Sequence, residues 1–245
     1  MKQSFFRIIN NTQLTETVYK MKLSGDVSDI TSPGQFVNIK IDGLYLRRPI
    51  SVCDSENDVL TLIYKVVGKG TEKMAEMEIG TELDVLTGLG NGYNTAVSGE
   101  KPLLIGGGVG VPPLYMLAKK LIAEGKKVNV ILGFNTKAEI FCEEDFKALG
   151  AEVVVATADG SYGVKGFVTD ALSDVDYTYF YTCGPEPMLK ALYKATATSG
   201  QFSFEERMGC GFGACMGCSC KTITGYKRIC KDGPVLEKEE ILWAD

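Results

Sequence analysis

Apolar residues in the first part of the chain recur in short segments rich in Val, Ile, Tyr and Phe. These segments cover residues 4–10, 16–23, 35–41, 59–67 and 82–86. Turn-forming residues separate them, as at Pro33-Gly34 and Asp42-Gly43. Short strands at regular spacing with turns between them are typical of a small antiparallel barrel. We expect residues 1–97 to form this barrel, with a short helical insertion over residues 71–78.

The pattern changes near residue 98 to an alternation of buried strands and helices. Short apolar runs, which indicate parallel strands covered on both faces, occupy residues 102–105, 127–133, 151–156 and 177–182. Helical segments are expected from residue 114 to 121 and over residues 143–149, 166–172 and 187–197. This alternation predicts a doubly wound α/β domain over residues 98–200. Residues 201–245 form a third, cysteine-rich segment with little predicted regular structure.

The composition narrows the possible chemistry. The 245 residues are enough for one large or two modest domains, and a net charge of −5 without a basic stripe argues against nucleic acid. No apolar run approaches the ~20 residues that span a bilayer. No histidine is present, which excludes Ser-His and Cys-His catalysis and His-bound haem or zinc. The chain shows no apolar secretory segment, so a reducing, cytoplasmic compartment is expected.

The most specific pattern is the cysteine array near the end of the chain. Cys210, Cys215 and Cys218 form C-x4-C-x2-C, and Cys230 follows twelve positions later. Soft thiolate ligands at this spacing suit a [2Fe–2S] cluster, and the glycines among them let backbone amides approach the sulfurs. A zinc site would more often show two C-x2-C pairs, and a disulfide framework suits an oxidising compartment. Cys220 is an additional thiol, either spare or a ligand in place of Cys218.

Two glycine-containing turns in the α/β region are candidates for nucleotide binding. The turn from Gly106 to Gly110 lies between a predicted strand and a helix, where close backbone approach and the helix N-terminus favour phosphate. It does not spell G-x-G-x-x-G, and a tight turn without a ligand is the alternative. The sequence Cys183-Gly-Pro-Glu-Pro-Met188 follows a later strand, where open α/β sheets bind their ligands. The alternative there is an ordinary strand-to-helix turn.

The barrel region contains a third group of candidates. Arg48 and Ser51 are separated by Pro49 and an extended Ile50, and they can present polar contacts from one strand. Downstream, Tyr64 offers an aromatic face, and Gly70-Thr71 opens a short helix that suits phosphate. A surface salt bridge, a core tyrosine and a helix cap are the alternatives for each feature alone.

Together, in this order, these motifs resemble the ferredoxin–NADP reductase superfamily. Arg48-Pro-Ile-Ser51 looks like its flavin motif, and Cys183-Gly-Pro185 looks like its nicotinamide motif. Within the superfamily, the chain is most similar to the electron-transfer subunits of dihydroorotate dehydrogenase B. This resemblance covers nearly the whole chain, and residues 206–230 are its most specific part. One departure is Thr87-Gly88, where the family commonly has Gly-Pro, which makes the FAD environment there less defined.

The resemblance implies three cofactors and assigns residues to each, with no catalytic side chain. For FAD it implies Arg48, Pro49, Ile50, Ser51, Ile63, Tyr64, Lys65, Gly70 and Thr71. For NAD the positions are Gly107, Gly108, Gly110, Cys183, Gly184 and Pro185. For the [2Fe–2S] cluster the ligands are Cys210, Cys215, Cys218 and Cys230.

The resemblance also implies a function and a partner. Electrons would pass from the FMN of a separate dihydroorotate-oxidising catalytic subunit, through the cluster and FAD, to NAD+ in pyrimidine (UMP) biosynthesis. Two copies of each subunit would form a heterotetramer, with residues 208–230 facing the catalytic subunit. Alternatives are a related subunit serving sulfide, polysulfide or ferredoxin, and a non-catalytic redox sensor.

Overall fold

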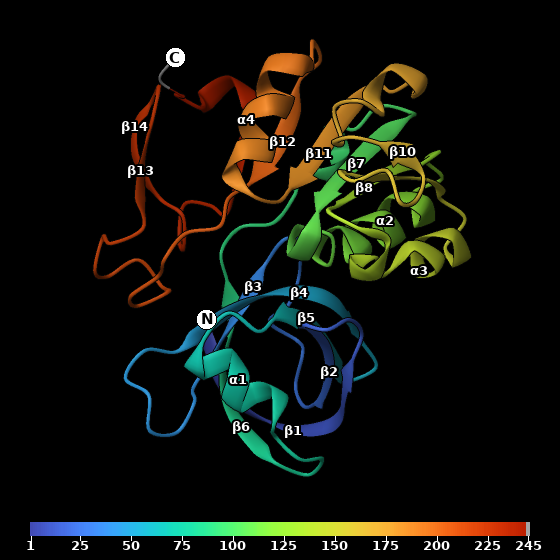
Figure 1. Ribbon diagram of the computed structural model, residues 1–245. Coiled ribbons are helices and arrows are strands. Elements are labelled where there is room, and N and C mark those ends of the chain that lie inside the picture. Colours follow the sequence, from blue (N-terminus) through green and yellow to red (C-terminus); the bar gives the residue numbers. More distant parts are fainter. Residues whose placement is uncertain (244–245) are drawn as a thin grey trace.

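The first part of the chain closes into an antiparallel barrel (Figure 1). The computed structural model describes residues 1–243. The barrel strands, in the spatial order β1-β2-β5-β4-β3-β6, are β1 (Lys2–Gln13), β2 (Val18–Ser24), β5 (Val59–Lys65), β4 (Arg48–Glu56), β3 (Phe36–Ile39) and β6 (Glu82–Leu89). Helix α1 (Lys69–Ala75) follows β5. The predicted barrel is confirmed. The strand expected to carry Arg48 and Ser51 is β4, whose bounds the apolar pattern did not predict because Arg, Pro, Ser and Asp interrupt it.

Strand β3 separates two apolar cores. Val37 and Ile39 pack into the barrel interior, whereas Phe36 packs into a cluster outside the barrel that includes Cys218 and Cys230. Successive side chains of a strand point to opposite faces, which explains this division. The cysteine segment therefore packs against the outer face of the barrel at β3.

The α/β domain is built on a sheet of seven strands. In spatial order these are β10 (Val164–Lys165), β9 (Glu152–Thr157), β8 (Asn129–Phe134), β7 (Pro102–Gly107), β11 (Tyr179–Cys183), β12 (Gly200–Ser203) and β15 (Val235–Glu237). All neighbours are parallel except β12 and β15.

Helices cover both faces of this sheet, as expected for a doubly wound fold. The helices are α2 (Pro113–Ala123), α3 (Glu143–Ala148) and α4 (Glu186–Ala195). Leu104 on β7 shares one core with α2 and α3, while its neighbours Leu103 and Ile105 share the other core with α4. Short 3-10 helices lie in the connections: η1 (Thr95–Val97), η2 (Gly108–Gly110), η3 (Lys137–Glu139), η4 (Leu172–Asp174) and η5 (Lys238–Glu240).

The helix expected over residues 166–172 is wrong. Gly166 has φ +122°, outside the helical region, and the carboxylate of Asp170 accepts a hydrogen bond from the amide of Phe167 at 2.7 Å. The amides of Asp170 and Ala171 then bond to carbonyls three residues earlier, as does that of Leu172. A side-chain cap competing for the backbone gives a series of tight turns instead of an α-helix.

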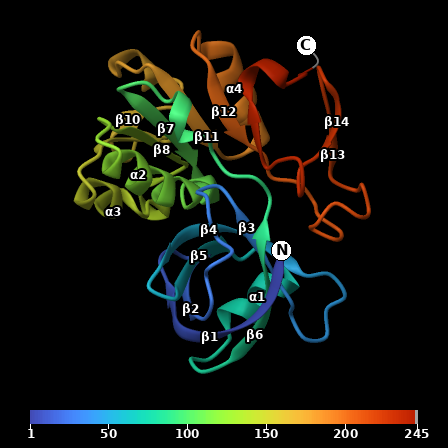
Figure 2. The same ribbon diagram turned by 180° about the vertical axis from the view of Figure 1, so that it is seen from behind.

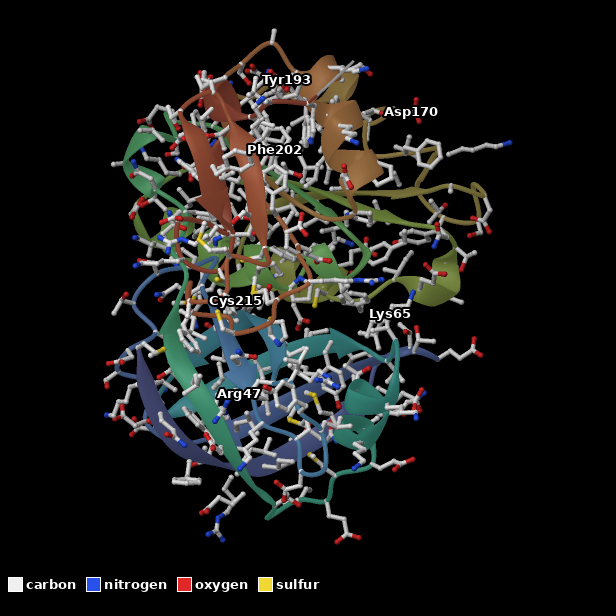
Figure 3. The ribbon with its side chains drawn as sticks, turned by 90° about the vertical axis from the view of Figure 1, so that its left-hand side faces the viewer. Arg47, Lys65, Asp170, Tyr193, Phe202 and Cys215 are labelled. Atoms are coloured by element: carbon white, nitrogen blue, oxygen red, sulfur yellow. The ribbon has the colours of Figure 1, made fainter. Side chains whose placement is uncertain are left out.

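The cysteine segment leaves the sheet and returns to it. It begins after β12, forms the hairpin β13 (Ser219–Thr222) and β14 (Gly225–Arg228), and ends in β15, which pairs with β12. Figure 2 shows this segment beside both the barrel and the sheet. Its aromatic support includes Tyr193 and Phe202, both labelled in Figure 3, with Trp243 against them at ring-centroid distances of 5.1 and 5.5 Å. The domain boundaries at 97/98 and 200/201 stay a prediction.

Two further observations bear on the environment of the protein. All eight cysteines are free thiols. Within residues 1–243, no helix has both the length and the apolar character needed to cross a bilayer.

Tyr93 connects the barrel side of the molecule to the sheet. Its backbone amide donates to the carbonyl of Pro33 at 2.8 Å, and its hydroxyl donates to the carbonyl of Thr182 on β11 at 3.2 Å. The ring also packs edge-on against Tyr181, with centroids 5.6 Å apart. Tyr93 is buried, so this hydroxyl bond is shielded from water.

We predict that Tyr93→Phe lowers the free energy of unfolding by about 1 kcal/mol, because the ring stays while one buried hydrogen bond is lost. Urea denaturation followed by circular dichroism would measure this loss. Tyr45→Phe is the matched control, since Tyr45 is fully exposed and should tolerate the change. Equal stabilities for the two variants would contradict the bridging role.

Candidate functional site

The barrel wall opens where two predicted flavin segments face each other. Strands β4 and β5 pair only between Val52↔Leu62 and Glu56↔Val59. Beyond this point, residues 48–51 pair with β3 alone, and residues 63–65 pair with β2 alone. Two strand edges are thus left without a ladder between them, and such edges offer unpaired backbone donors and acceptors. We call this opening the seam.

The predicted phosphate contacts of the flavin meet at one end of the seam. A Cβ atom placed on Gly70 would lie 2.0 Å from Nε of Arg48, so the guanidinium group packs against the first turn of α1. Thr71 donates its hydroxyl proton to the carbonyl of Gly68 at 3.0 Å and accepts from the amide of Val67 at 2.9 Å. A guanidinium group beside free helix amides fits a pyrophosphate, and Thr71 shapes the turn that presents them.

Tyr64 was expected to offer an aromatic face to the flavin, but its ring is not exposed. Tyr64 is buried in the barrel core, stacks on Tyr19 at 6.0 Å and donates its hydroxyl to Asn11 at 3.2 Å. Burial raises the pKa of this hydroxyl well above its usual range. Ile63 is also buried. These two positions therefore offer only backbone groups to the seam, whereas Lys65 is exposed beside it.

The two nucleotide motifs meet where the strand order of the sheet reverses. Strand β7 pairs with β8 on one side and β11 on the other, and Gly106 lies opposite Cys183. A Cβ atom on Gly110 would lie 2.3 Å from the carbonyl oxygen of Cys183, so only glycine permits this approach. Ligands of doubly wound sheets bind in the crevice at such a reversal. The structure thus brings together the predicted Gly107–Gly110 and Cys183–Pro185 segments.

A cavity of about 610 Å³ extends from this crevice to the barrel. Four of the residues predicted to bind FAD or NAD line this cavity: Lys65, Gly107, Gly108 and Pro185. Figure 3 shows Lys65 at the rim where the barrel meets the sheet domain. A cavity of this size suits a small-molecule cofactor, and it places the dinucleotide crevice next to the seam.

Two ionisable side chains, Glu205 and Cys183, lie at or near the cavity. Glu205 lines the cavity with an exposed side chain, and desolvation by the protein atoms around it raises the pKa of its carboxyl group. Sequence reasoning missed Glu205 as a site residue, although it directly precedes the most specific motif. The thiol of Cys183 is buried, and burial raises its pKa well above the usual range. Cys183 is therefore a neutral neighbour of the crevice.

The four predicted ligands lie in two pairs. Among residues 1–243, no three His, Cys, Asp or Glu side chains converge on a point that could hold one metal ion. Backbone hydrogen bonds instead link them two by two: the amide of Cys215 donates to Sγ of Cys210, and the amide of Cys230 donates to Sγ of Cys218. A [2Fe–2S] cluster has two irons that share four cysteine ligands, so two pairs suit it better than a single-ion zinc site.

The surroundings of Cys210 favour a thiolate ligand. The amides of Ala214 and Cys215 donate to its Sγ at 3.2 and 3.4 Å. Partial burial would raise the pKa of Cys210, but these amides and that of Phe212 outweigh it and lower the pKa to about 6. Amide donors around cluster sulfurs are what the glycine-rich loop predicted. The residues present therefore fit the cluster.

The second pair differs in its environment. Cys218 and Cys230 are buried, and the amide of Cys230 donates to Sγ of Cys218 at 3.4 Å. Burial and the neighbouring Cys218 raise the pKa of Cys230. Cys220 is outside both pairs and lines a smaller cavity of about 310 Å³ with Phe204 and Trp243. The ligand set of four, with Cys220 spare, stays a prediction that this arrangement supports.

A barrel with an open seam, a dinucleotide crevice and a four-cysteine segment define a class: flavin- and nicotinamide-dependent oxidoreductases that transfer electrons. Comparison with known proteins gives a narrower assignment. Residues 205–242 match the iron-sulfur cluster binding domain of dihydroorotate dehydrogenase B, and residues 104–194 match the oxidoreductase NAD-binding domain.

Curated relatives extend this similarity to the whole chain. The electron transfer subunit of dihydroorotate dehydrogenase B (NAD(+)) from Shouchella clausii is 45% identical, with 98% of each chain covered. The same subunit from Fusobacterium nucleatum is 46% identical, with 96% of each chain covered. This chain belongs to the family of dihydroorotate dehydrogenase B electron transfer subunits. It is an oxidoreductase subunit whose cofactors are an iron–sulfur cluster, FAD and NAD.

Solved structures agree with the fold. An NADH-dependent reduced ferredoxin-NADP oxidoreductase aligns with a TM-score of 0.88 and 30% identity, covering 97% of this chain and 90% of that one. Flavohemoglobin from Malassezia yamatoensis, solved with FAD and haem, aligns with a TM-score of 0.71 and 21% identity, covering 80% of this chain and 56% of that one. At that identity the second similarity concerns the fold alone.

We predict that Cys215→Ser removes the visible absorbance of the iron–sulfur cluster while FAD stays bound, because the seam and the cysteine segment are separate sites. Absorption spectra together with iron and flavin analysis would test this. Cys220→Ser is the matched control and should keep the cluster. Full cluster absorbance in Cys215→Ser would remove Cys215 from the ligand set.

We predict that Arg48→Ala and Gly70→Ala both weaken FAD retention. The first removes the guanidinium group, and the second displaces it, since the added Cβ would overlap Nε of Arg48. Gly68→Ala is the control, because Gly68 has an extended backbone and no atom within 4 Å of an added Cβ. Flavin stoichiometry after gel filtration measures the effect. Unchanged flavin content in both variants would contradict the seam as the FAD site.

Proposed function

We propose that this chain carries electrons between NAD+ and an FMN-containing catalytic subunit that oxidises dihydroorotate to orotate in pyrimidine (UMP) biosynthesis. The proposal combines the family assignment with one structural observation. The seam lies between the two other sites: β3, paired with residues 48–51, supports the cysteine segment on its outer face, and Lys65 lines the nucleotide cavity. The three sites therefore adjoin one another in the order that a relay requires.

The chain's own residues have binding and positioning roles. Gly107 and Gly108 let a dinucleotide approach the backbone at the end of β7, and Arg48 with the first turn of α1 holds the FAD pyrophosphate. The amides around Cys210 stabilise its thiolate. When bound, FAD exchanges two electrons with nicotinamide and single electrons with an iron–sulfur cluster. No side chain is assigned as acid, base or nucleophile.

The proposed contact with the catalytic subunit is the surface of the cysteine segment. Phe212 and Met216 lie next to Cys215 in the sequence or close to it, and Tyr226 lies on β14 of the same segment. Of their surfaces 43, 56 and 73% is accessible, and Cys215 is exposed as well. Exposed apolar side chains in the segment that carries a functional group favour an interaction site there. This placement suits one-electron transfer, which needs a short gap, and a heterotetramer with two copies of each subunit.

The proposed location is the cytoplasm. The eight free cysteines support it, since a chain with this many thiols would form disulfides in an oxidising compartment.

A second candidate is an electron transfer subunit that serves ferredoxin instead. The similarity to the NADH-dependent reduced ferredoxin-NADP oxidoreductase supports it, at lower identity than the dihydroorotate dehydrogenase B relatives. The two functions share their internal sites and differ in the partner.

We predict that the protein, co-expressed with its organism's dihydroorotate-oxidising FMN subunit, copurifies with it and confers dihydroorotate-dependent reduction of NAD+. Phe212→Asp combined with Tyr226→Asp should abolish copurification but leave NADH able to bleach the bound flavin, because neither side chain lines the nucleotide cavity. Ile79→Asp, also on an exposed apolar residue but outside both cavities, is the control and should copurify.

Stable binding to ferredoxin without any dihydroorotate-dependent activity would overturn the proposed function in favour of the second candidate. A protein without flavin, or with a flavin that NADH does not bleach, would favour the redox sensor.

A further inference from the structure

Asn38 on β3 makes a direct bond between the barrel and the cysteine segment. Its side-chain amide donates from Nδ2 to the carbonyl oxygen of Cys210 at 3.2 Å. The residue is 1% exposed, so the donor side of this bond is shielded from water, whereas Cys210 is partly exposed. It joins positions 172 residues apart in the sequence. No motif in the sequence predicted a role for Asn38.

The other half of the amide group is unsatisfied. Oδ1 of Asn38 is buried and has no hydrogen-bond partner among the described residues. A buried polar atom without a partner costs free energy, and an apolar side chain of the same shape would avoid that cost. Barrel packing alone therefore does not account for an asparagine at this position. What asparagine provides, and an apolar side chain could not, is the hydrogen-bond donor to the backbone carbonyl of Cys210.

The cysteine segment is shaped to receive this donor. Gly211 has φ +78°, and a Cβ atom there would lie 2.3 Å from Nδ2 of Asn38. A residue other than glycine would push the asparagine away. The contact thus depends on two positions, one on the barrel and one directly after the first predicted ligand.

The barrel side of the contact is held rigidly. The guanidinium group of Arg47 (Figure 3) donates to the backbone carbonyl of Asn38 at 3.3 Å and pairs with the carboxylate of Asp84 at 2.9 Å. Asn38 also lies opposite Pro49 in the β3–β4 ladder. The residue that holds the Cys210 peptide is therefore fixed in register with the edge of the seam.

We propose that Asn38 is a positioning residue for electron transfer. It holds the peptide of Cys210 against β3 and so sets the distance and orientation between the cluster and the flavin segment at residues 48–51. Its bond to the Cys210 carbonyl also polarises that peptide, because hydrogen bonds along a chain strengthen one another. The inference rests on the proposed function, in which Cys210 is a cluster ligand and residues 48–51 bind FAD.

The test compares Asn38→Leu and Asn38→Asp with the wild-type chain. Both variants lack the donor, and the second adds a negative charge beside the first ligand. We expect all three proteins to retain FAD and iron. We also expect the midpoint potential of the cluster to become more negative in the order wild type, Asn38→Leu, Asn38→Asp, with a changed electron paramagnetic resonance spectrum of the reduced cluster. Reduction of the cluster after mixing with NADH, followed by stopped flow, should slow several-fold in both variants.

Gln35→Leu is the matched control. Gln35 is another buried amide beside β3, but its side-chain bonds run to Gly90 and Thr31 within the barrel region. General damage to the barrel would alter the cluster equally in this control and would overturn the inference. Potentials and transfer rates of Asn38→Leu equal to those of the wild type would also overturn it. A wild-type chain without any cluster would overturn the proposed function and this inference with it.

Discussion

The separation of β4 from β5 is the constraint on which the rest of the structure depends. A closed barrel satisfies its backbone groups by pairing each strand on both sides, and here that pairing stops after Val52↔Leu62. Pro49 lies on the unpaired stretch and has no amide proton to leave unsatisfied. The opening is therefore local: β3 and β2 still hold the two free edges in place. The seam thus exposes backbone polar groups to a cofactor while the rest of the barrel stays closed around its core.

Both neighbouring units pack against the barrel through apolar clusters. The cysteine segment is joined to the barrel by an apolar cluster that runs from Phe36 and Leu89 to Ile229 and Cys230. The sheet domain is joined to it by a second cluster, in which Val18, Cys53 and Ile63 of the barrel lie with Leu114 of α2. Ion pairs add to this second contact, since Lys119 on α2 pairs with Asp54 and Glu56 on β4 at 2.9 and 2.7 Å. Because ion pairs that are open to water add little stability, the apolar burial on both sides is what holds the two units against the barrel.

Much of this arrangement could be predicted from the sequence, and the failures have physical causes. The cysteine array and glycine turns were recognisable because their chemistry depends on spacing within a short stretch. The prediction of a helix over residues 166–172 was wrong because the side chain of Asp170 caps a turn, and hydrophobic periodicity carries no information about such a cap. Tyr64 was expected to offer an aromatic face, but side chains in a strand alternate between faces and this ring faces the barrel core, so its place in the FAD site stays a prediction that concerns its backbone. Asn38 could not be found, since its partner lies 172 residues away.

The two cysteine pairs differ in burial: one lies towards the surface and the other is buried. Cys210 and Cys215 lie towards the surface, and amide donors to Sγ of Cys210 favour its thiolate. Cys218 and Cys230 lie in the apolar cluster, and burial raises the pKa of Cys230. Asn38 contacts the peptide of Cys210 from the barrel side, and Phe212 and Met216, which are close to Cys215 in the sequence, are exposed. The pair in the more polar environment is therefore the one that adjoins both the seam and the surface proposed for the partner subunit.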